Sequence, residues 1–179
     1  GSTAAMSSAT AMRTHLCGEL RPAQIGETVT VCGWVARRRE HGEHLAFVDL
    51  RDHTGIVQCV VDNDVDVRSE YVVRVTGTVR VCPDGMTNAT LDTGEVEVAA
   101  AQVEVLSQAQ TPPFPLEDRV DADETMRLQY RYLDMRRPSV ARAMHIRSDV
   151  TGIIRRVMEA NGFLDIETPL LTRSTPEGA

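Results

Sequence analysis

The sequence contains no lysine, so all 19 of its basic residues are arginines. A bias toward arginine codons explains this absence most simply. It nevertheless means that every cation available for a phosphate or a base is a planar guanidinium with several donors. The net charge of -7 argues against non-specific binding of nucleic acid by the whole surface. A local basic site is still compatible with this net charge.

Long apolar runs and cysteine pairs are also missing. No stretch approaches the roughly 20 apolar residues of a membrane-spanning helix, and no charged-then-apolar signal segment opens the chain. We therefore expect a cytoplasmic protein with no membrane partner. The cysteines (Cys17, Cys32, Cys59 and Cys82) are far apart and form no C-x-x-C pair. They predict buried free thiols rather than disulfides or a zinc site.

Residues 1–11, GSTAAMSSATA, are small and polar. We expect a cloning tag and a disordered extension there, with no part in the fold. Met6 and Met12 are the two candidates for the natural start. The rest of the chain is long and apolar enough to bury a core and to hold one or two domains.

Short runs of alternating apolar and polar residues fill the region up to residue 107. They begin near residue 28 and include 45–51, 56–61, 71–81 and 95–106. In the second run, alternation places Ala46, Val48 and Leu50 on the core face and Phe47 on the polar face. Five strands in about eighty residues predict a small closed barrel, best matched by an all-β OB-fold with its ligand on the face of strands two and three.

Three further local features refine this prediction. Residues 63–69 are the one plausible place for a helix between the third and fourth strands. Gly33 indicates a bulge or a close backbone approach, and the alanines at 99–101 indicate a bulge in the fifth strand. Val81 is expected on the core face of the fourth strand.

Beyond the barrel the pattern changes. Residues 108–124, with three prolines and five acidic residues, predict a hinge linker. Helices are expected over 124–136 and from Pro138 to Asn161-Gly162, followed by a strand over 163–168. Because residues 125–179 are too few to bury their own apolar faces, they indicate the start of a larger α+β domain.

The stretch from Trp34 to Gln58 contains Arg37, Arg38 and Arg39, a glycine-containing loop and Phe47. Arginines beside an aromatic on short strands are typical of a platform for single-stranded nucleic acid. An arginine triplet is, however, more often a solvated strand end.

Other polar residues of this region have plainer explanations. His41 and His44 lack further ligands, so we expect no metal site. Asp49 and Asp52 suggest acid–base chemistry, but we expect them to pair with an arginine, either Arg39 or Arg51.

Six ordered motifs resemble those of the bacterial-type aspartyl-tRNA synthetases: MRTHLCGEL, CGWVARRR, FVDLRDHTGIVQ, TGEVEV, YRYLDMRRP and GFLDIETPLLTRSTPEGA. The resemblance covers nearly the whole chain from Met12. It implies an OB-fold anticodon-binding domain at 12–107, a hinge at 108–124, and at 125–179 the truncated start of a class II catalytic domain with its dimer-forming motif 1. The full-length enzyme would be a homodimer that uses ATP and Mg²⁺ to join aspartate to tRNA.

The resemblance also implies roles for single residues. Those matched to anticodon contacts are Arg39, Phe47, Gln58, Arg80, Asn88 and Glu95. Their chemistry agrees, since an aromatic stacks on bases, amides and arginines reach base edges, and a carboxylate accepts from guanine. Glu177, in the start of the aspartate-pocket loop, matches a contact to the amino group of the substrate.

No catalytic residue, metal ligand or bound cofactor is expected in this chain. The sequence contains no ATP-holding motif 2 or 3, so we expect this chain alone to be inactive.

Two loop positions concern specificity. Enzymes of this family that charge both aspartate and asparagine tRNAs tend to carry a histidine and a glycine near the third anticodon base, where His41 and Gly85 stand here. The resemblance thus implies a non-discriminating enzyme, with tRNA(Asp) and tRNA(Asn) as partners and no DNA partner. The alternatives are a discriminating aspartyl enzyme, a free-standing OB module for single strands, and a structural role through dimerisation of residues 136–169.

Overall fold

The computed structural model describes residues 12–83 and 87–171. It divides into two compact units, Gly1–Pro113 and Phe114–Ala179. The first unit begins with two short 3-10 turns, η1 (Cys17–Glu19) and η2 (Pro22–Gln24). Five strands follow: β1 (Thr28–His41), β2 (Leu45–Arg51), β3 (Ile56–Asp62), β4 (Val72–Val81) and β5 (Val96–Ser107).

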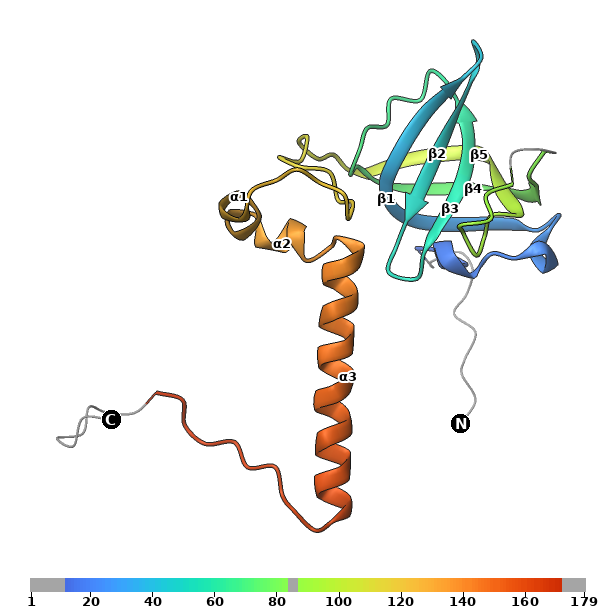
Figure 1. The fold of residues 1–179 in the computed structure, drawn as a ribbon. Coiled ribbons are helices and arrows are strands. Elements are labelled where there is room, and N and C mark those ends of the chain that lie inside the picture. The colour runs from blue at the N-terminus through green and yellow to red at the C-terminus, as the bar shows by residue number, and fades with distance from the viewer. Residues whose placement is uncertain (1–11, 84–86, 172–179) are drawn as a thin grey trace. The chain divides into compact units, whose positions relative to one another are not determined.

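These strands form a closed barrel in the order β1-β2-β3-β5-β4, and β4 returns to pair with β1 (Figure 1). The pairing of β3 with β5 is parallel, and the other pairings are antiparallel. The barrel predicted from the spacing of the apolar runs is therefore confirmed.

The interior of the barrel follows the alternation of the strands. Ala46, Val48 and Leu50 of β2 are at most 1% exposed, as predicted, and Phe47 lies on the other face. Full burial of each valine or leucine side chain stabilises the fold by about 1.5–3 kcal/mol. Val81 was expected in the core but is 59% exposed; it is the last residue of β4.

Two glycines allow the strands to approach closely. A Cβ atom on Gly33 would collide with the carbonyl oxygen of Arg51, and one on Gly77 would collide with that of Ala99. The register of β5 skips Ala101 opposite Gly77, so the bulge predicted in the alanine stretch is confirmed. In β1 the irregularity falls at Ala36, three residues after Gly33.

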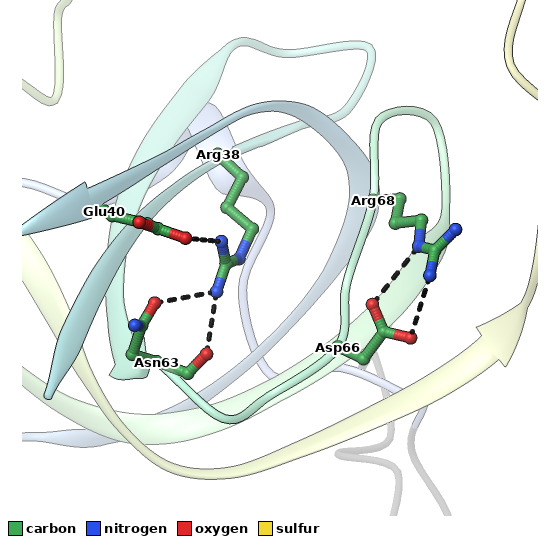
Figure 2. A network of polar contacts seen from close by, with 5 residues as sticks. All are labelled: Arg38, Glu40, Asn63, Asp66 and Arg68. Carbon is green, nitrogen blue, oxygen red and sulfur yellow. Dashed lines mark hydrogen bonds and ion pairs between the residues drawn. The ribbon is translucent and has the colours of Figure 1, made fainter. Parts of the chain in front are cut away.

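The connection between β3 and β4 contains no helix in any of its residues, 63–71, all of which the structure describes. The one stretch that was a plausible place for a helix between these strands therefore forms none. Turns held by side chains take its place: Arg38 donates to the backbone and side-chain oxygens of Asn63 at 2.8 and 3.0 Å (Figure 2). Asp66 pairs with Arg68 at 3.2 Å further along. Buried Val67 fixes the connection to the barrel core.

The second unit is helical, with α1 (Glu124–Gln129), α2 (Arg131–Asp134) and α3 (Pro138–Ala160). The single helix predicted over 124–136 is interrupted at Tyr130, whose backbone (φ -107°, ψ 47°) leaves the helical region. Helix α3 begins at Pro138 and ends before Asn161 and Gly162, as predicted. Within the described part of the chain, no helix combines the length and the apolar character that a membrane crossing requires.

The strand predicted over 163–168 is not formed. A strand needs a partner for its backbone groups, and the described part of the second unit contains no strand. Phe163, Leu164 and Ile166 are accordingly exposed.

A buried ion pair holds the start of the second unit together. Arg137 donates to Asp134 Oδ1 at 2.9 Å and to the backbone oxygens of Glu117 and Asp118 at 2.9 and 3.0 Å. Burial raises the pKa of Asp134, but the hydrogen bond from Arg137 and the charges of Arg131 and Arg137 outweigh it, so that pKa is lowered. The chain ahead of α1 is thereby bonded to the α2–α3 junction.

Candidate nucleic-acid interface

Four polar residues from four strands lie in one row across the outside of the barrel. Asp49 of β2 is the cross-strand partner of Gln58 of β3, and Gln58 is the partner of Glu97 of β5. Glu97 is in turn the partner of Arg80 of β4. Side chains of directly opposed residues project from the same face of a sheet, so the register alone brings these four together.

Hydrogen bonds connect this row and join Arg39 of β1 to it. Arg80 Nε and Gln58 Nε2 donate to the two oxygens of Glu97 at 2.7 and 2.9 Å. Arg39 Nη2 donates to Gln58 Oε1 at 3.1 Å and to Asp49 Oδ1 at 3.2 Å. We call these five residues the polar row. Its carboxylate Glu97 is fully buried, whereas the side chains of Arg39 and Arg80 are 41% and 51% exposed.

An aromatic platform adjoins the polar row at Arg39. Phe47 is the cross-strand partner of Arg39, whose Cζ lies 5.7 Å from the centroid of the Phe47 ring. The ring of His41 lies 4.7 Å from that of Phe47, tilted by 42°. His41 was expected in a loop but is the last residue of β1, which fixes its backbone beside Phe47. A cation and two rings in contact can hold a flat base by stacking.

Two other predicted contact residues lie near the start of β5. Asn88 borders a small hollow that Asp49 and Gln58 also line. Its side-chain oxygen accepts from the backbone N–H and the hydroxyl of Thr90 at 3.0 and 2.6 Å, so its amide nitrogen is the group available to a ligand. Glu95 is exposed and immediately precedes β5.

The structure therefore brings together Arg39, Phe47, Gln58 and Arg80, with His41 beside Phe47 and Asn88 at the edge of the polar row. Gly85 and Glu177 lie outside the described residues.

Sequence reasoning did not predict that Glu97 belongs to the polar row. The alternation in TGEVEV gives Glu95 and Glu97 the same face, but only the parallel pairing of β3 with β5 places Glu97 opposite Gln58. That pairing joins segments far apart in the chain, and no local pattern reports it. Asp49 pairs with Arg39, one of the two partners expected, while Arg51 bonds both oxygens of Glu70 at 2.9 Å.

The prediction that Asp52 pairs with an arginine is wrong. Its carboxylate accepts from the backbone N–H of Cys17 at 2.7 Å and from that of Thr54 at 2.8 Å. Burial raises the pKa of Asp52, but hydrogen bonds from Thr54, Cys17 and Gly55 outweigh it and lower that pKa. Asp52 thus attaches η1 to the turn between β2 and β3.

The four cysteines are free and buried, as predicted. Burial, followed by the charges of Asp49 and Glu97, raises the pKa of Cys59 to about 12. A thiol with so high a pKa stays protonated and is a poor nucleophile. Among residues 12–83 and 87–171, no group of three or more histidine, cysteine or acidic residues could hold a metal ion.

Comparisons with known proteins agree with this architecture. Residues 29–106 match the family model described as OB-fold nucleic acid binding domain, and residues 123–179 match that of the tRNA synthetases class II (D, K and N). Residues 123–179 thus contain the start of a class II tRNA synthetase catalytic domain of the Asp, Lys and Asn type, and the barrel that precedes it is an OB-fold nucleic-acid-binding domain.

Solved synthetases have a similar fold. The asparaginyl-tRNA synthetase of Pyrococcus horikoshii, complexed with asparaginyl-adenylate, is 26% identical with a TM-score of 0.71, over 87% of this chain and 36% of that one. A putative aspartyl-tRNA synthetase of Leishmania major is 22% identical with a TM-score of 0.76, over 94% and 36% of the two chains.

The aspartyl tRNA synthetase of Entamoeba histolytica is 22% identical with a TM-score of 0.73, over 84% of this chain and 38% of that one. This chain therefore spans well under half the length of these synthetases. Both amino-acid specificities occur among them.

Proposed function

We propose that this chain is the anticodon-binding part of an aspartate–tRNA ligase. The complete protein activates aspartate with ATP and Mg²⁺ and transfers it to the 3′ end of tRNA. The observation that carries the proposal is the meeting of Arg39, Phe47, Gln58 and Arg80, from four strands, on the barrel face where OB-folds hold single strands. The aspartyl-type motifs YRYLDMRRP and STPEGA favour aspartate over asparagine or lysine.

The chemistry of this face suits unpaired RNA bases. Single-stranded RNA is read by stacking on aromatics and by hydrogen bonds to base edges that the loop leaves accessible. Phe47 supplies the stacking surface, and the half-exposed guanidinium groups of Arg39 and Arg80 supply cations. Gln58 and Asn88 supply amides, and Glu95 supplies an acceptor for the donors of a guanine.

The proposal extends to which tRNAs are accepted. His41 beside Phe47, together with Gly85 in the sequence, supports a complete enzyme of the non-discriminating type, which attaches aspartate to both tRNA(Asp) and tRNA(Asn). A histidine ring can donate and accept hydrogen bonds, so it suits either pyrimidine at the third anticodon position.

The proposal also covers the complete protein. Its catalytic domain binds ATP, Mg²⁺ and aspartate, and Glu177 contacts the amino group of aspartate. Residues 12–83 and 87–171 take no part in the chemical steps. The complete enzyme is a cytoplasmic homodimer, and this chain alone does not aminoacylate.

The test is aminoacylation by the complete gene product that contains this chain. Transcripts of tRNA(Asp) and tRNA(Asn) are each incubated with ATP, Mg²⁺ and radiolabelled aspartate. Charging of both is the expected result. Charging of tRNA(Asp) alone would assign the discriminating type, and charging of tRNA(Asn) with asparagine but not aspartate would overturn the aspartate assignment. A gene that stops near residue 179 would instead favour a free-standing OB module.

A further inference from the structure

The tip of the β1–β2 hairpin extends beyond the closed part of the barrel. β1 pairs with β4 only from Thr28 to Trp34, whereas its last part, from Arg37 to His41, pairs with β2 alone. Among the strands that the structure describes, none pairs with the free side of this last part. Figure 1 shows the connection between β1 and β2 projecting past the other strands. His41, which is proposed to meet the third anticodon base, lies at the end of this edge.

The side chains of this edge alternate between two faces. Arg39 and His41 lie on the outer face with Phe47, and Arg38 lies on the opposite face. The guanidinium of Arg38 is turned toward the connection between β3 and β4, and its side chain is only 23% exposed (Figure 2). Arg38 therefore reaches into the molecule from the face that the RNA is not proposed to contact.

Asn63 bonds to both sides of the hairpin tip. Arg38 Nη2 donates to the backbone oxygen of Asn63 at 2.8 Å and to its side-chain oxygen at 3.0 Å (Figure 2). The backbone N–H of Asn63 donates to the backbone oxygen of His44, the residue before β2, at 2.9 Å. One residue thus holds β1 through Arg38 and the start of β2 through His44.

We propose that Arg38 and Asn63 are positioning residues for recognition of the third anticodon base. They fix the tip of the β1–β2 hairpin, so that His41 is already ordered beside Phe47 when RNA binds. Neither Arg38 nor Asn63 touches the RNA. An ordered tip avoids the loss of conformational freedom that binding would otherwise impose on it. This inference rests on the proposed anticodon-binding function and on the role proposed there for His41.

Packing alone does not require an arginine at position 38. Desolvation of a guanidinium is costly, and an apolar side chain would fill the same space without that cost. The carboxylate that pairs with Arg38, that of Glu40, lies 3.5 Å away on a side chain that is 70% exposed. An ion pair of this kind contributes little to stability. The contribution particular to Arg38 is its connection to Asn63.

Arg68 offers a matched control on the same connection. It pairs with Asp66 at 3.2 Å, and the two side chains are 71% and 73% exposed (Figure 2). Both partners belong to the connection between β3 and β4, so their ion pair does not hold the hairpin. Arg68→Met should therefore change neither the order of the hairpin tip nor the binding of RNA.

The experiment combines RNA binding with a double-mutant cycle. The RNA is a hairpin with the anticodon loop of tRNA(Asp), and fluorescence anisotropy measures its Kd for the full 179-residue chain. Arg38→Met keeps an unbranched stem but removes the donors. It should raise the Kd by about 2- to 12-fold, which is the cost of ordering one side chain. In a His41→Ala background the same substitution should have no further effect, because the ring that it positions is gone.

Three further measurements separate positioning from a general loss of stability. Arg38→Lys keeps one cationic donor for the two oxygens of Asn63 and should retain most of the affinity. Asn63→Ala removes one of those two oxygens, so its effect should be smaller than that of Arg38→Met and in the same direction. In the free Arg38→Met protein, ¹⁵N relaxation should give lower backbone order parameters for residues 41–44, while the barrel strands keep the rigid value of about 0.85.

The outcomes separate the two proposals. Failure of the unaltered chain to bind the hairpin would overturn the proposed function, and this inference with it. Binding by the unaltered chain, together with equal effects of Arg38→Met in the presence and absence of His41, would overturn the positioning role alone. Unchanged order parameters for residues 41–44 would overturn it as well. If Arg38→Met does not fold, Asn63→Ala takes its place in the cycle and is judged by the same criteria.

Discussion

Gln58 and Glu97 are cross-strand partners on the only parallel pair of strands among the described residues, and Gln58 Nε2 donates to Glu97 Oε2 at 2.9 Å. This contact closes a chain of hydrogen bonds that runs from Arg39 on β1 to Arg80 on β4. The residues proposed to contact the anticodon are thus coupled before RNA arrives. Substitution of one of them should therefore alter the others.

Replacement of Phe47 should weaken RNA binding without unfolding the barrel. Phe47 lies on the outer face beside Arg39 and His41, and loss of base stacking on an aromatic costs about 1–3 kcal/mol. Phe47→Ala should therefore raise the dissociation constant of the anticodon hairpin by about 5- to 150-fold. Fluorescence anisotropy with a labelled hairpin measures this.

Phe163→Ala is the matched control for Phe47→Ala, because Phe163 is an exposed phenylalanine of the second unit. It should leave the dissociation constant unchanged. Equal losses from the two substitutions would contradict the location of the site.

Two arginines of β4, each of which forms an ion pair with a glutamate of β5, should differ in their contribution to stability. Arg80→Ala leaves the buried carboxylate of Glu97 with Gln58 as its remaining partner, which should cost about 1–3 kcal/mol of unfolding free energy. Arg74→Ala breaks an exposed ion pair with Glu104, which is worth about 0–1 kcal/mol. Urea unfolding of the two variants measures the difference. A larger loss for Arg74→Ala would show that burial of Glu97 does not govern this pair.

Local pattern predicted most of the barrel but not the polar row. The alternation of Ala46, Val48 and Leu50 predicted the buried face of β2 and left Phe47 outside, because a strand alternates its side chains whatever it pairs with. The position of Glu97 opposite Gln58 depends on a pairing between β3 and β5, and the strand expected over 163–168 depends on a partner strand. Both depend on tertiary contacts, which the local sequence of a strand does not specify.

Acid should weaken the attachment of η1 through Asp52. The pKa of Asp52 is lowered in the folded state, since hydrogen bonds from Thr54, Cys17 and Gly55 outweigh the opposing effect of burial. Its stabilisation is thus fully present above the unfolded pKa of about 3.9 and is lost as the pH falls through the lower folded value. The stability difference between the wild type and Asp52→Asn should therefore shrink below about pH 4.

Chemical denaturation at a series of pH values tests the role of Asp52. Asp62→Asn, which changes an exposed carboxylate at the end of β3, serves as the control and should behave as the wild type. A stability difference for Asp52→Asn that stays constant across the acid range would contradict the role of its charge.

The buried thiols should resist alkylation in the folded protein. Cys17 and Cys59 are fully buried, and burial raises the pKa of both thiols, that of Cys59 to about 12. Since the thiolate is the reactive form, iodoacetamide near neutral pH should label neither residue until the protein unfolds. Mass spectrometry of peptides after a short labelling pulse, with and without urea, measures this. Rapid labelling of native Cys59 would show that the barrel opens locally.

His41 should decide how the third anticodon base is read. Its ring lies 4.7 Å from that of Phe47 and can donate or accept a hydrogen bond, so it suits the amino group of cytosine and the carbonyl oxygen of uracil. The unaltered chain should bind two hairpins, one with cytosine and one with uracil as the third anticodon base, with similar affinity. His41→Leu removes both options, so the ratio of the two affinities should move away from one. His44→Leu, in the turn that follows β1, should leave the ratio unchanged. If both substitutions change the ratio equally, the loop as a whole rather than His41 controls the choice.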